Sequence, residues 1–370
     1  MSTQKASKLM TIIIPCYNIE PYIRPCLHAI MEQNIIDRCQ VLCIDDGCTD
    51  GTTKHLERYA KKNPNVITIL DKRNKYGVKN SGVSLARNYG LDNATGQTVM
   101  FVDGDDLIGG RPEALHLTDR YYLENFYDSL MTNPDTAMVV GSMDYVTRNG
   151  KELIPTRRFD NLNSQLKQIQ KQGDPKYDKS LDFLDYRISS CNTLYRTDII
   201  NKTNPTLNLR FVPNMMYFED ANFVMQYAFR AIEEKYPYIL RPTDTPAWYL
   251  YRSRPHSAMH KLSNHSESDM RRLERTKKRL EYYAYLLQEC ETHFGISSRI
   301  YNIAAHRYAN KTAADIEKYS REAYESEYDT MLDTFIPTEC RHGCNHHDCN
   351  QCGYQYKLKY MCSKLLARTK

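Results

Sequence analysis

The sequence is short of features that would assign the protein to several familiar classes. It contains no apolar run close to the roughly 20 residues that a transmembrane helix needs, and its first ten residues are polar, so we expect neither a membrane span nor a signal peptide. The formal net charge is only +5 on 370 residues, and the basic residues are scattered along the chain. We therefore expect no nucleic-acid partner.

Glycine-rich phosphate-binding loops are also missing. The chain contains neither G-x-G-x-x-G nor G-x-x-x-x-G-K-[ST], which are the signatures of dinucleotide-binding and P-loop proteins. What remains is an ordinary globular composition, with 41% hydrophobic and 26% charged residues. The length suits one catalytic domain with extensions. Without a visible secretory signal, the twelve cysteines are interpreted as reduced thiols of a cytoplasmic protein.

Apolar segments and helical patterns alternate through the first 110 residues. The apolar segments, at which we expect buried strands, are 10–15, 41–44, 66–70 and 99–102. Apolar residues at helical spacing lie between them, for example from Ile23 to Met31 and from Val83 to Leu91. This alternation predicts an α/β fold with a mostly parallel central sheet that helices cover on both faces.

Three carboxylates follow the fourth expected strand directly. Asp103, Asp105 and Asp106 surround Gly104 at the point where the chain leaves the sheet. Ligands of open α/β folds bind at this edge, and carboxylates with a glycine between them suit a hard divalent cation that keeps phosphate and water ligands. A turn that is simply rich in Asp and Gly is the alternative interpretation.

Four stretches of sequence occur in an order that resembles a known family. They are Thr-Ile-Ile-Ile-Pro-Cys-Tyr-Asn at 11–18, Ile-Asp-Asp-Gly-Cys-Thr-Asp at 44–50, Gly-Val-Ser-Leu-Ala-Arg-Asn-Tyr-Gly at 82–90 and Phe-Val-Asp-Gly-Asp-Asp at 101–106. Together they resemble family 2 of the glycosyltransferases over about residues 10–260. The resemblance implies the GT-A fold and a nucleotide-sugar donor.

The resemblance also implies which residues contact the donor. The end of the first strand and the second Asp of the Asp-Asp-Gly turn hold the nucleotide in this family, usually uridine. This points to Pro15, Tyr17 and Asp46, with Glu20 nearby. A carboxylate suits a uracil N–H, and a tyrosine ring can stack on the base. Arg87 resembles the arginine of the family that contacts the donor.

Metal and catalytic roles follow from the same resemblance. Asp103 is expected to face the ribose and the metal, and Asp105 to bind Mg²⁺ or Mn²⁺ directly. Asp220 corresponds to the catalytic base and Glu219 to its supporting neighbour, although an acidic residue at a helix start is also favoured by the helix dipole alone. The stretch 249–257 resembles the segment near the phosphates. Its Arg252, Arg254 and His256 are predicted diphosphate or metal contacts.

The remaining sequence predicts extensions to a catalytic domain at 1–262. Residues 151–180 are polar and predict an inserted loop, 263–335 a helical extension, and 336–370 a Cys/His-rich segment with a basic tail. Cys340, Cys344, Cys349 and Cys352 predict a structural zinc site, with free thiols as the alternative. The tail predicts peripheral contact with an anionic membrane at its inner face, or equally a solvated helix.

The sequence therefore predicts a metal-dependent glycosyltransferase that moves a sugar from a nucleotide donor, expected to be UDP-linked, to a hydroxyl of a saccharide or lipid-linked acceptor with inversion. Two alternatives stay open. A nucleotide-sugar pyrophosphorylase would need a glycine-rich basic loop after the first strand, and residues 15–18 do not supply one. A non-catalytic scaffold that kept the fold is the other.

Overall fold

In the computed structural model the chain divides into two compact units, Met1–His260 and Lys261–Lys370. All of the described residues lie in the first unit. The described residues are 8–77, 82–109, 120–152, 189–201, 209–213, 215, 219–245 and 247–253. The predicted segments 263–335 and 336–370 lie outside the described residues, as does the predicted insertion from residue 153 onward. The predicted division into domains therefore stays a prediction.

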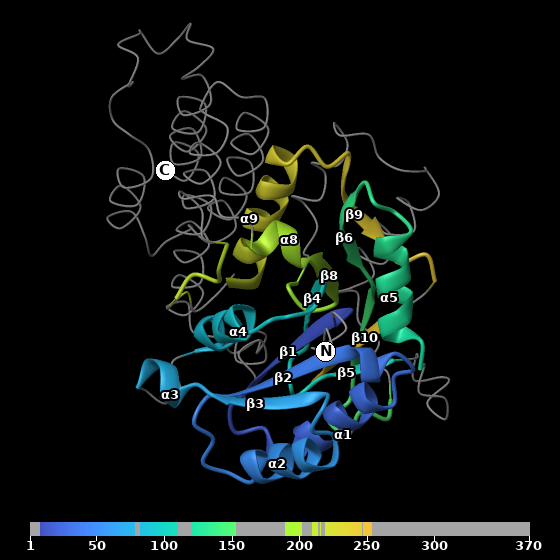
Figure 1. Ribbon diagram of the computed structural model, residues 1–370. Helices are drawn as coiled ribbons and strands as arrows, with labels where there is room; N and C mark the ends of the chain where they lie inside the picture. The colour runs from blue at the N-terminus through green and yellow to red at the C-terminus, as the bar shows by residue number, and fades with distance from the viewer. Residues whose placement is uncertain are drawn as a thin grey trace, which may run out of the picture. The chain divides into compact units, whose positions relative to one another are not determined.

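In the described part, seven strands form the larger sheet, in the order β3-β2-β1-β4-β8-β6-β9 (Figure 1). Their bounds are β1 Met10–Cys16, β2 Cys39–Asp45, β3 Ile67–Asp71, β4 Thr98–Phe101, β6 Thr136–Val140, β8 Thr193–Arg196 and β9 Tyr238–Pro242. Neighbouring strands are parallel except at β8, which runs antiparallel to both β4 and β6. The predicted mostly parallel sheet is confirmed.

The central strands are buried on both faces. Every residue of β4 is buried, and in β1 only Pro15 is partly exposed. Such strands need helices on each side of the sheet, which explains why the sequence alternates apolar runs with helical patterns. The two strands pair in register from Met10 opposite Thr98 to Ile13 opposite Phe101, so their carboxyl ends reach the same edge.

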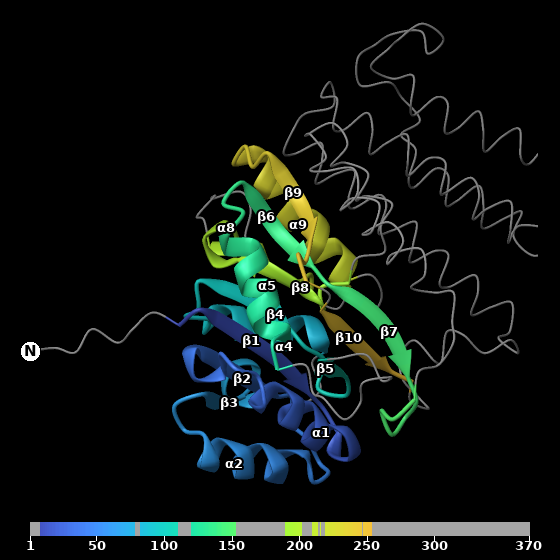
Figure 2. The same ribbon diagram turned by 90° about the vertical axis from the view of Figure 1, so that its right-hand side faces the viewer.

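Helices cover the sheet as the alternation predicts. The bounds are α1 Glu20–Met31, a 3₁₀ turn Ile36–Arg38, α2 Thr52–Lys62, α3 Arg73–Tyr76, α4 Val83–Asp92, α5 Tyr122–Met131, α8 Thr197–Asn201 and α9 Glu219–Glu233. Helix α4 packs on β1 and β2, whereas α1 and α2 pack on one another on the opposite side of these strands (Figures 1 and 2). The helices α4 and α9 carry the residues that are important for the site.

A smaller sheet was not expected from the sequence. Within the described residues it consists of β5 Leu107–Gly109, β10 Trp248–Arg252 and β7 Ser142–Val146, with β10 in the middle. Strand β10 runs antiparallel to β5 and parallel to β7. Because β5 begins directly after the carboxylate cluster, this sheet brings the distant strand β10 beside the cluster.

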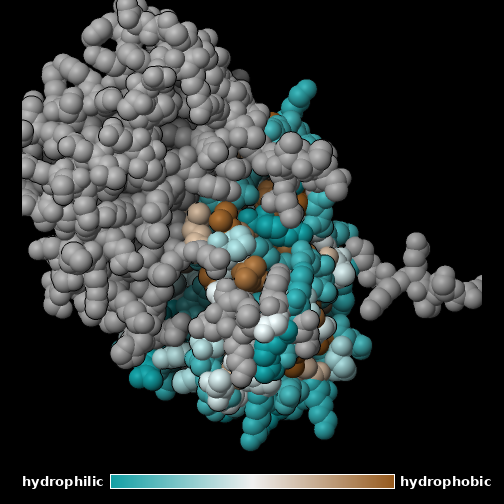
Figure 3. Space-filling model, turned by 90° about the vertical axis from the view of Figure 1, so that its left-hand side faces the viewer, coloured by the Kyte–Doolittle hydropathy of each residue, from teal (hydrophilic) through white to brown (hydrophobic). Residues whose placement is uncertain are grey.

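The surface of the described part is that of an ordinary globular fold. On the face that Figure 3 shows, hydrophobic side chains form small groups within a mostly hydrophilic surface. Among the described residues, the large hydrophobic side chains that stay exposed are Tyr17 and Tyr121. None of the helices described here has the length and apolar character that crossing a membrane requires.

Candidate active site

The three carboxylates after β4 lie in a tight turn at the carboxyl edge of the sheet. The backbone N–H of Asp106 donates to the carbonyl oxygen of Asp103 at 2.9 Å. A Cβ at Gly104 would lie 2.4 Å from Cδ1 of Ile19, so a larger residue between the carboxylates would have to displace this buried side chain. Asp103 and Asp105 remain partly exposed, whereas Asp106 is buried. The turn thus presents two carboxylates to a ligand and keeps the third inside.

Arg87 of α4 joins this turn to the start of α9. Its buried guanidinium donates from Nη2 to Oδ1 of Asp103 at 2.9 Å and from Nη1 to Oε1 of Glu219 at 3.2 Å. The ring of Phe211 lies 5.1 Å from the guanidinium carbon. Burial acts to lower the pKa of Arg87, but the carboxylates around it, Asp103 first, outweigh burial and raise the pKa well above its usual value. The side chain therefore stays charged and holds two carboxylates together.

Aromatic packing fixes the position of α9 relative to this cluster. The rings of Phe211 and Phe223 stack with centroids 4.3 Å apart, and Phe101 of β4 meets both rings edge-on. Asn88 exchanges two hydrogen bonds of 2.8 Å with the backbone of Phe211. These buried contacts explain how residues far apart in sequence arrive at one site, which the motifs alone do not show.

The predicted catalytic pair, Glu219 and Asp220, opens α9. Oδ1 of Asp220 accepts the Ala221 N–H at 2.7 Å, and Oδ2 accepts the hydroxyl of Ser189 at 3.1 Å, so the orientation of this carboxylate is fixed. Burial, followed by the charge of Asp220, raises the pKa of Glu219 to about 7, although Arg87 opposes the shift. Two adjacent carboxylates therefore have different environments, a frequent feature of sites that transfer protons.

The raised pKa of Glu219 predicts a measurable dependence of stability on pH. Between the unperturbed value of 4.5 and about 7, the folded state binds more protons at Glu219 than the unfolded state does, so the free energy of unfolding falls as the pH rises through this window. We expect this fall to be smaller by about 1–3 kcal/mol in the Glu219→Gln variant. Urea unfolding of both proteins at several pH values measures it. If the free energy of unfolding depends on pH in the same way in both proteins, the raised pKa of Glu219 is contradicted.

Asp46, the carboxylate predicted to bind the uracil ring, is held by a lysine that the motifs did not identify. Nζ of Lys72 lies 2.7 Å from Oδ1 of Asp46, and it also donates to the carbonyl oxygen of Gly82 at 3.0 Å. Burial lowers the pKa of Lys72, and pairing with Asp46 opposes this effect. Lys72 directly follows β3, so its place at the carboxyl edge of the sheet was the available signal. Through these two contacts Lys72 links the Asp-Asp-Gly turn to the start of α4.

The other predicted nucleotide contacts lie at the end of β1 and the start of α1. Pro15 is the penultimate residue of β1, and Tyr17 is 39% exposed, which leaves its ring accessible for stacking. Glu20 has a different environment. Its Oε2 accepts the N–H of Gly51 at 3.0 Å, while Asp50 accepts the N–H of Glu20 at 3.0 Å. Glu20 therefore ties the amino termini of α1 and α2 together, and its contact with a nucleotide stays a prediction.

Arg252 ends β10 beside the carboxylate turn. Its side chain is buried, with the guanidinium carbon 5.3 Å from the centroid of the Tyr22 ring. Its Nε and Nη2 have no hydrogen-bond partner among the described residues. Contact between Arg252 and phosphate stays a prediction. Arg254 and His256 lie outside the described residues, as do the predicted zinc ligands Cys340, Cys344, Cys349 and Cys352.

The donor atoms fit a divalent cation that is shared with a ligand. Across the described residues, no three His, Cys, Asp or Glu side chains form a group that could hold a metal ion by themselves. Mg²⁺ usually takes only one or two carboxylates and completes its shell with phosphate and water. Two partly exposed carboxylates, Asp103 and Asp105, on one turn match that requirement.

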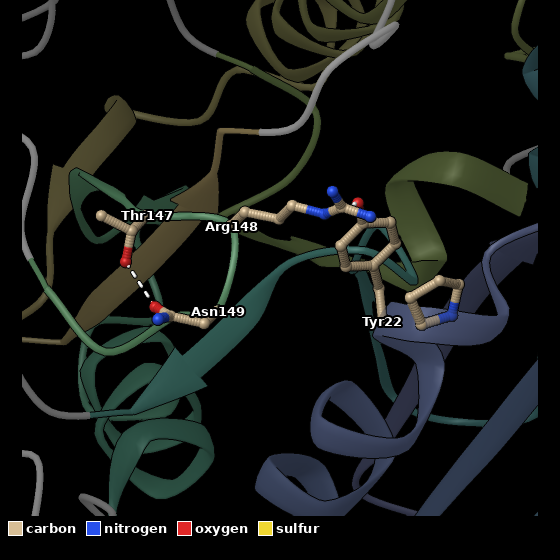
Figure 4. Close-up of a pocket in the computed structure, with 5 residues that line it drawn as sticks. Tyr22, Thr147, Arg148 and Asn149 are labelled. Atoms are coloured by element: carbon tan, nitrogen blue, oxygen red, sulfur yellow. Dashed lines mark hydrogen bonds between the residues drawn. The ribbon is translucent and has the colours of Figure 1, made fainter.

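A shallow pocket near α1 is lined by other residues. It has a volume of about 410 Å³ and is formed by Pro21, Tyr22, Thr147, Arg148 and Asn149. Figure 4 shows Arg148 extended toward the ring of Tyr22, whose hydroxyl accepts from Nε at 3.0 Å. None of these five residues belongs to the predicted donor, metal or catalytic set, so the pocket does not redefine the site.

A family model matches this arrangement of motifs. The model described as glycosyl transferase family 2 matches residues 11–203, which is just over half of the 370 residues. The chain belongs to glycosyl transferase family 2. The matched range of this family 2 chain includes Asp46, Arg87 and the carboxylate turn, and it ends before Glu219 and Asp220.

Relatives and solved structures agree with the family. The chain is 35% identical over 100 residues to the uncharacterized glycosyltransferase EpsJ of Bacillus subtilis, which covers 27% of each chain. It is 28% identical over 220 residues to a teichoic acid poly(glycerol phosphate) polymerase of Staphylococcus epidermidis, covering 59% of this chain and 26% of the relative. The matches thus span about a quarter of the length of these relatives.

The fold itself is shared with S. aureus TarS, solved in complex with UDP-GlcNAc. The TM-score is 0.62 at 18% identity, with 98% of this chain and 89% of that chain covered. The GT-A fold predicted from the sequence is confirmed.

Proposed function

We propose that this chain transfers a sugar from a UDP-linked donor to a hydroxyl group of a saccharide or lipid-linked acceptor, with inversion at the anomeric carbon. The observation that carries the proposal is the position of Arg87, which holds the carboxylate turn after β4 against the first turn of α9. A donor site and a candidate general base are thereby adjacent. Cell-surface polymers are the acceptor class that the name of the S. epidermidis relative suggests.

The donor base fits the end of β1 and the turn after β2. Asp46 accepts a hydrogen bond from the N–H of a uracil, and the exposed ring of Tyr17 stacks on the base. Lys72 keeps the Asp46 carboxylate in one position through its 2.7 Å contact. Cytosine has no N–H at the equivalent ring position, so this arrangement favours uridine nucleotides over cytidine nucleotides.

The diphosphate fits the carboxylate turn together with a divalent cation. Asp105 would bind Mg²⁺ or Mn²⁺ directly, and Asp103 would assist. When bound, the cation supplies positive charge for the leaving diphosphate. Arg87 orients Asp103 through its 2.9 Å contact.

Asp220 acts as the general base. The hydroxyl of the acceptor gives its proton to the Asp220 carboxylate, and its oxygen forms a bond to the anomeric carbon while the bond from that carbon to the diphosphate oxygen breaks. UDP leaves on the opposite face of the sugar. Ser189 and the Ala221 N–H fix the carboxylate, and such alignment contributes much of the rate enhancement. Because the family match ends before this residue, its assignment rests on the motif resemblance, and the contact between Arg87 and the neighbouring Glu219 supports it.

Thermal unfolding with nucleotide and metal tests the proposal. UDP and Mn²⁺ together are expected to raise Tm, since a ligand at 100 times its Kd adds about 2.7 kcal/mol to the free energy of unfolding. CDP with Mn²⁺ should raise Tm less, because it lacks the N–H that Asp46 accepts. The purified chain should then release UDP slowly from at least one member of a panel of UDP-sugars.

Each outcome of this test distinguishes between the proposals. Equal shifts with UDP and CDP would contradict the role of Asp46. No shift with any nucleotide would overturn the proposed function and favour a scaffold protein. A shift without UDP release from any sugar in the panel would favour a nucleotide-binding protein without transferase activity.

A further inference from the structure

A buried tyrosine hydroxyl connects the carboxylate turn to strand β10. Tyr249 is fully buried, and its hydroxyl donates to Oδ2 of Asp106 at 2.8 Å while it accepts the backbone N–H of Asp103 at 3.1 Å. The other oxygen of Asp106, Oδ1, accepts the backbone N–H of Arg252 at 2.8 Å. The side chains of Tyr249 and Asp106 therefore use their polar atoms on backbone groups and on one another.

We propose that Tyr249 and Asp106 are positioning residues that set the affinity of the turn for the divalent cation, by locking Asp103 and Asp105 in place without touching cation or nucleotide. The inference rests on the proposed function, because it assumes that the turn holds a cation with a diphosphate. Neither residue is among the donor, metal and catalytic residues that the family resemblance implies.

The position of the turn in the chain explains why it needs the hydrogen bonds of Tyr249 and Asp106. Before the turn, Asp103 follows a strand of the larger sheet, and after the turn Leu107 begins a strand of the smaller sheet. Residues 102–106 alone connect β4 to β5, and they include Gly104, which has the fewest backbone restraints. Metal-binding side chains must be held within roughly 0.5 Å of their productive positions.

The hydrogen bonds supply this restraint on both sides of the exposed carboxylates. Tyr249 holds the backbone N–H of Asp103 before the exposed carboxylates. After them, the side chain of Asp106 is held by the Tyr249 hydroxyl and by the backbone N–H of Arg252. Strand β10 is a rigid support, since Tyr249 pairs with Ile108 of β5 and with Met143 of β7 on its two edges. The three strands and the turn therefore form one hydrogen-bonded unit around the predicted metal ligands.

The test compares two buried tyrosine hydroxyls. Tyr249→Phe removes the hydroxyl that bonds to Asp103 and Asp106, and it keeps the aromatic ring. Tyr227→Phe is the matched control, because the hydroxyl of the buried Tyr227 likewise donates one hydrogen bond and accepts one, here to the Ala137 carbonyl at 2.7 Å and from the Arg196 N–H at 2.9 Å. Both variants are expected to lose similar amounts of unfolding free energy. Only Tyr249→Phe should change binding of the cation.

The measured quantity is the Mn²⁺ concentration at which UDP binding is half-maximal. Calorimetry on the full chain measures it. We expect Tyr249→Phe to raise this concentration roughly 10–100-fold, the usual effect of losing a residue that orients metal ligands. Affinity for UDP without metal should stay at the wild-type value. Asp106→Asn, which keeps one acceptor oxygen, should raise the concentration by a smaller factor.

The outcomes separate this inference from the proposed function. If UDP binding by the wild-type chain does not depend on Mn²⁺, both this inference and the metal-assisted mechanism of the proposed function are overturned. A wild-type chain with metal-dependent binding, and equal Mn²⁺ requirements in Tyr249→Phe, Tyr227→Phe and wild type, would overturn only the positioning role. Should Tyr249→Phe fail to fold, the Asp106→Asn variant tests the inference. If its Mn²⁺ concentration for half-maximal UDP binding equals that of the wild type, the inference is contradicted.

Discussion

Replacement of Asp220 with asparagine is expected to lower the rate of sugar transfer by about 10²–10⁴-fold, the usual contribution of a general base. The amide cannot take a proton from the acceptor hydroxyl, yet it keeps the size of the side chain and one oxygen for the bond from Ser189. Affinity for UDP with Mn²⁺ should stay close to that of the wild type, because donor contacts lie on other elements. Turnover and UDP binding are measured on the same preparation.

A matched control for this variant exists on another helix. Asp198 in the first turn of α8 accepts the N–H of Ile199 at 2.9 Å, much as Asp220 accepts the N–H of Ala221. Asp198→Asn should cost similar helix stability and leave turnover unchanged. If Asp220→Asn retains near-normal turnover, or if both variants lose it equally, Asp220 is not the base.

Loss of Arg87 should have the largest effect on stability. Its side chain is 4% exposed, and its guanidinium pairs with two carboxylates. The side chains of these partners, Asp103 and Glu219, are 29% and 17% exposed. Arg87→Met leaves both carboxylates without their cation, and removal of one partner from a buried ion pair costs about 3–5 kcal/mol. We expect roughly 2–4 kcal/mol here, since Asp103 keeps some contact with water. Urea unfolding at pH 7 measures the loss.

Variants at the same position and at the surface test the explanation. Arg87→Lys should recover only part of the loss, because an ammonium group cannot make both contacts in one plane as a guanidinium does. Arg210 pairs with Asp92 at 2.9 Å on the surface, so Arg210→Met should cost no more than about 1 kcal/mol. If the two Arg→Met variants lose equal stability, the buried network does not act as described.

Four strands of the central sheet and the position of the carboxylate turn could be predicted from the sequence. Parallel strands that are buried on both faces must be apolar throughout, so 10–15, 41–44, 66–70 and 99–102 were recognisable without coordinates. The carboxylates after the fourth strand could lie only where that strand leaves the sheet. Motif order then indicated the family, which the match to residues 11–203 confirms.

Tertiary structure alone decided how the site is assembled. Arg87 and Glu219 are 132 residues apart, and their contact depends on ring stacking between Phe211 and Phe223 rather than on any local pattern. The strands of the smaller sheet have only three to five residues, too few to show a period, so the support that Tyr249 gives to the turn was not predictable. Local sequence fixes which segments are buried, but contacts between distant segments depend on how the buried surfaces pack against one another.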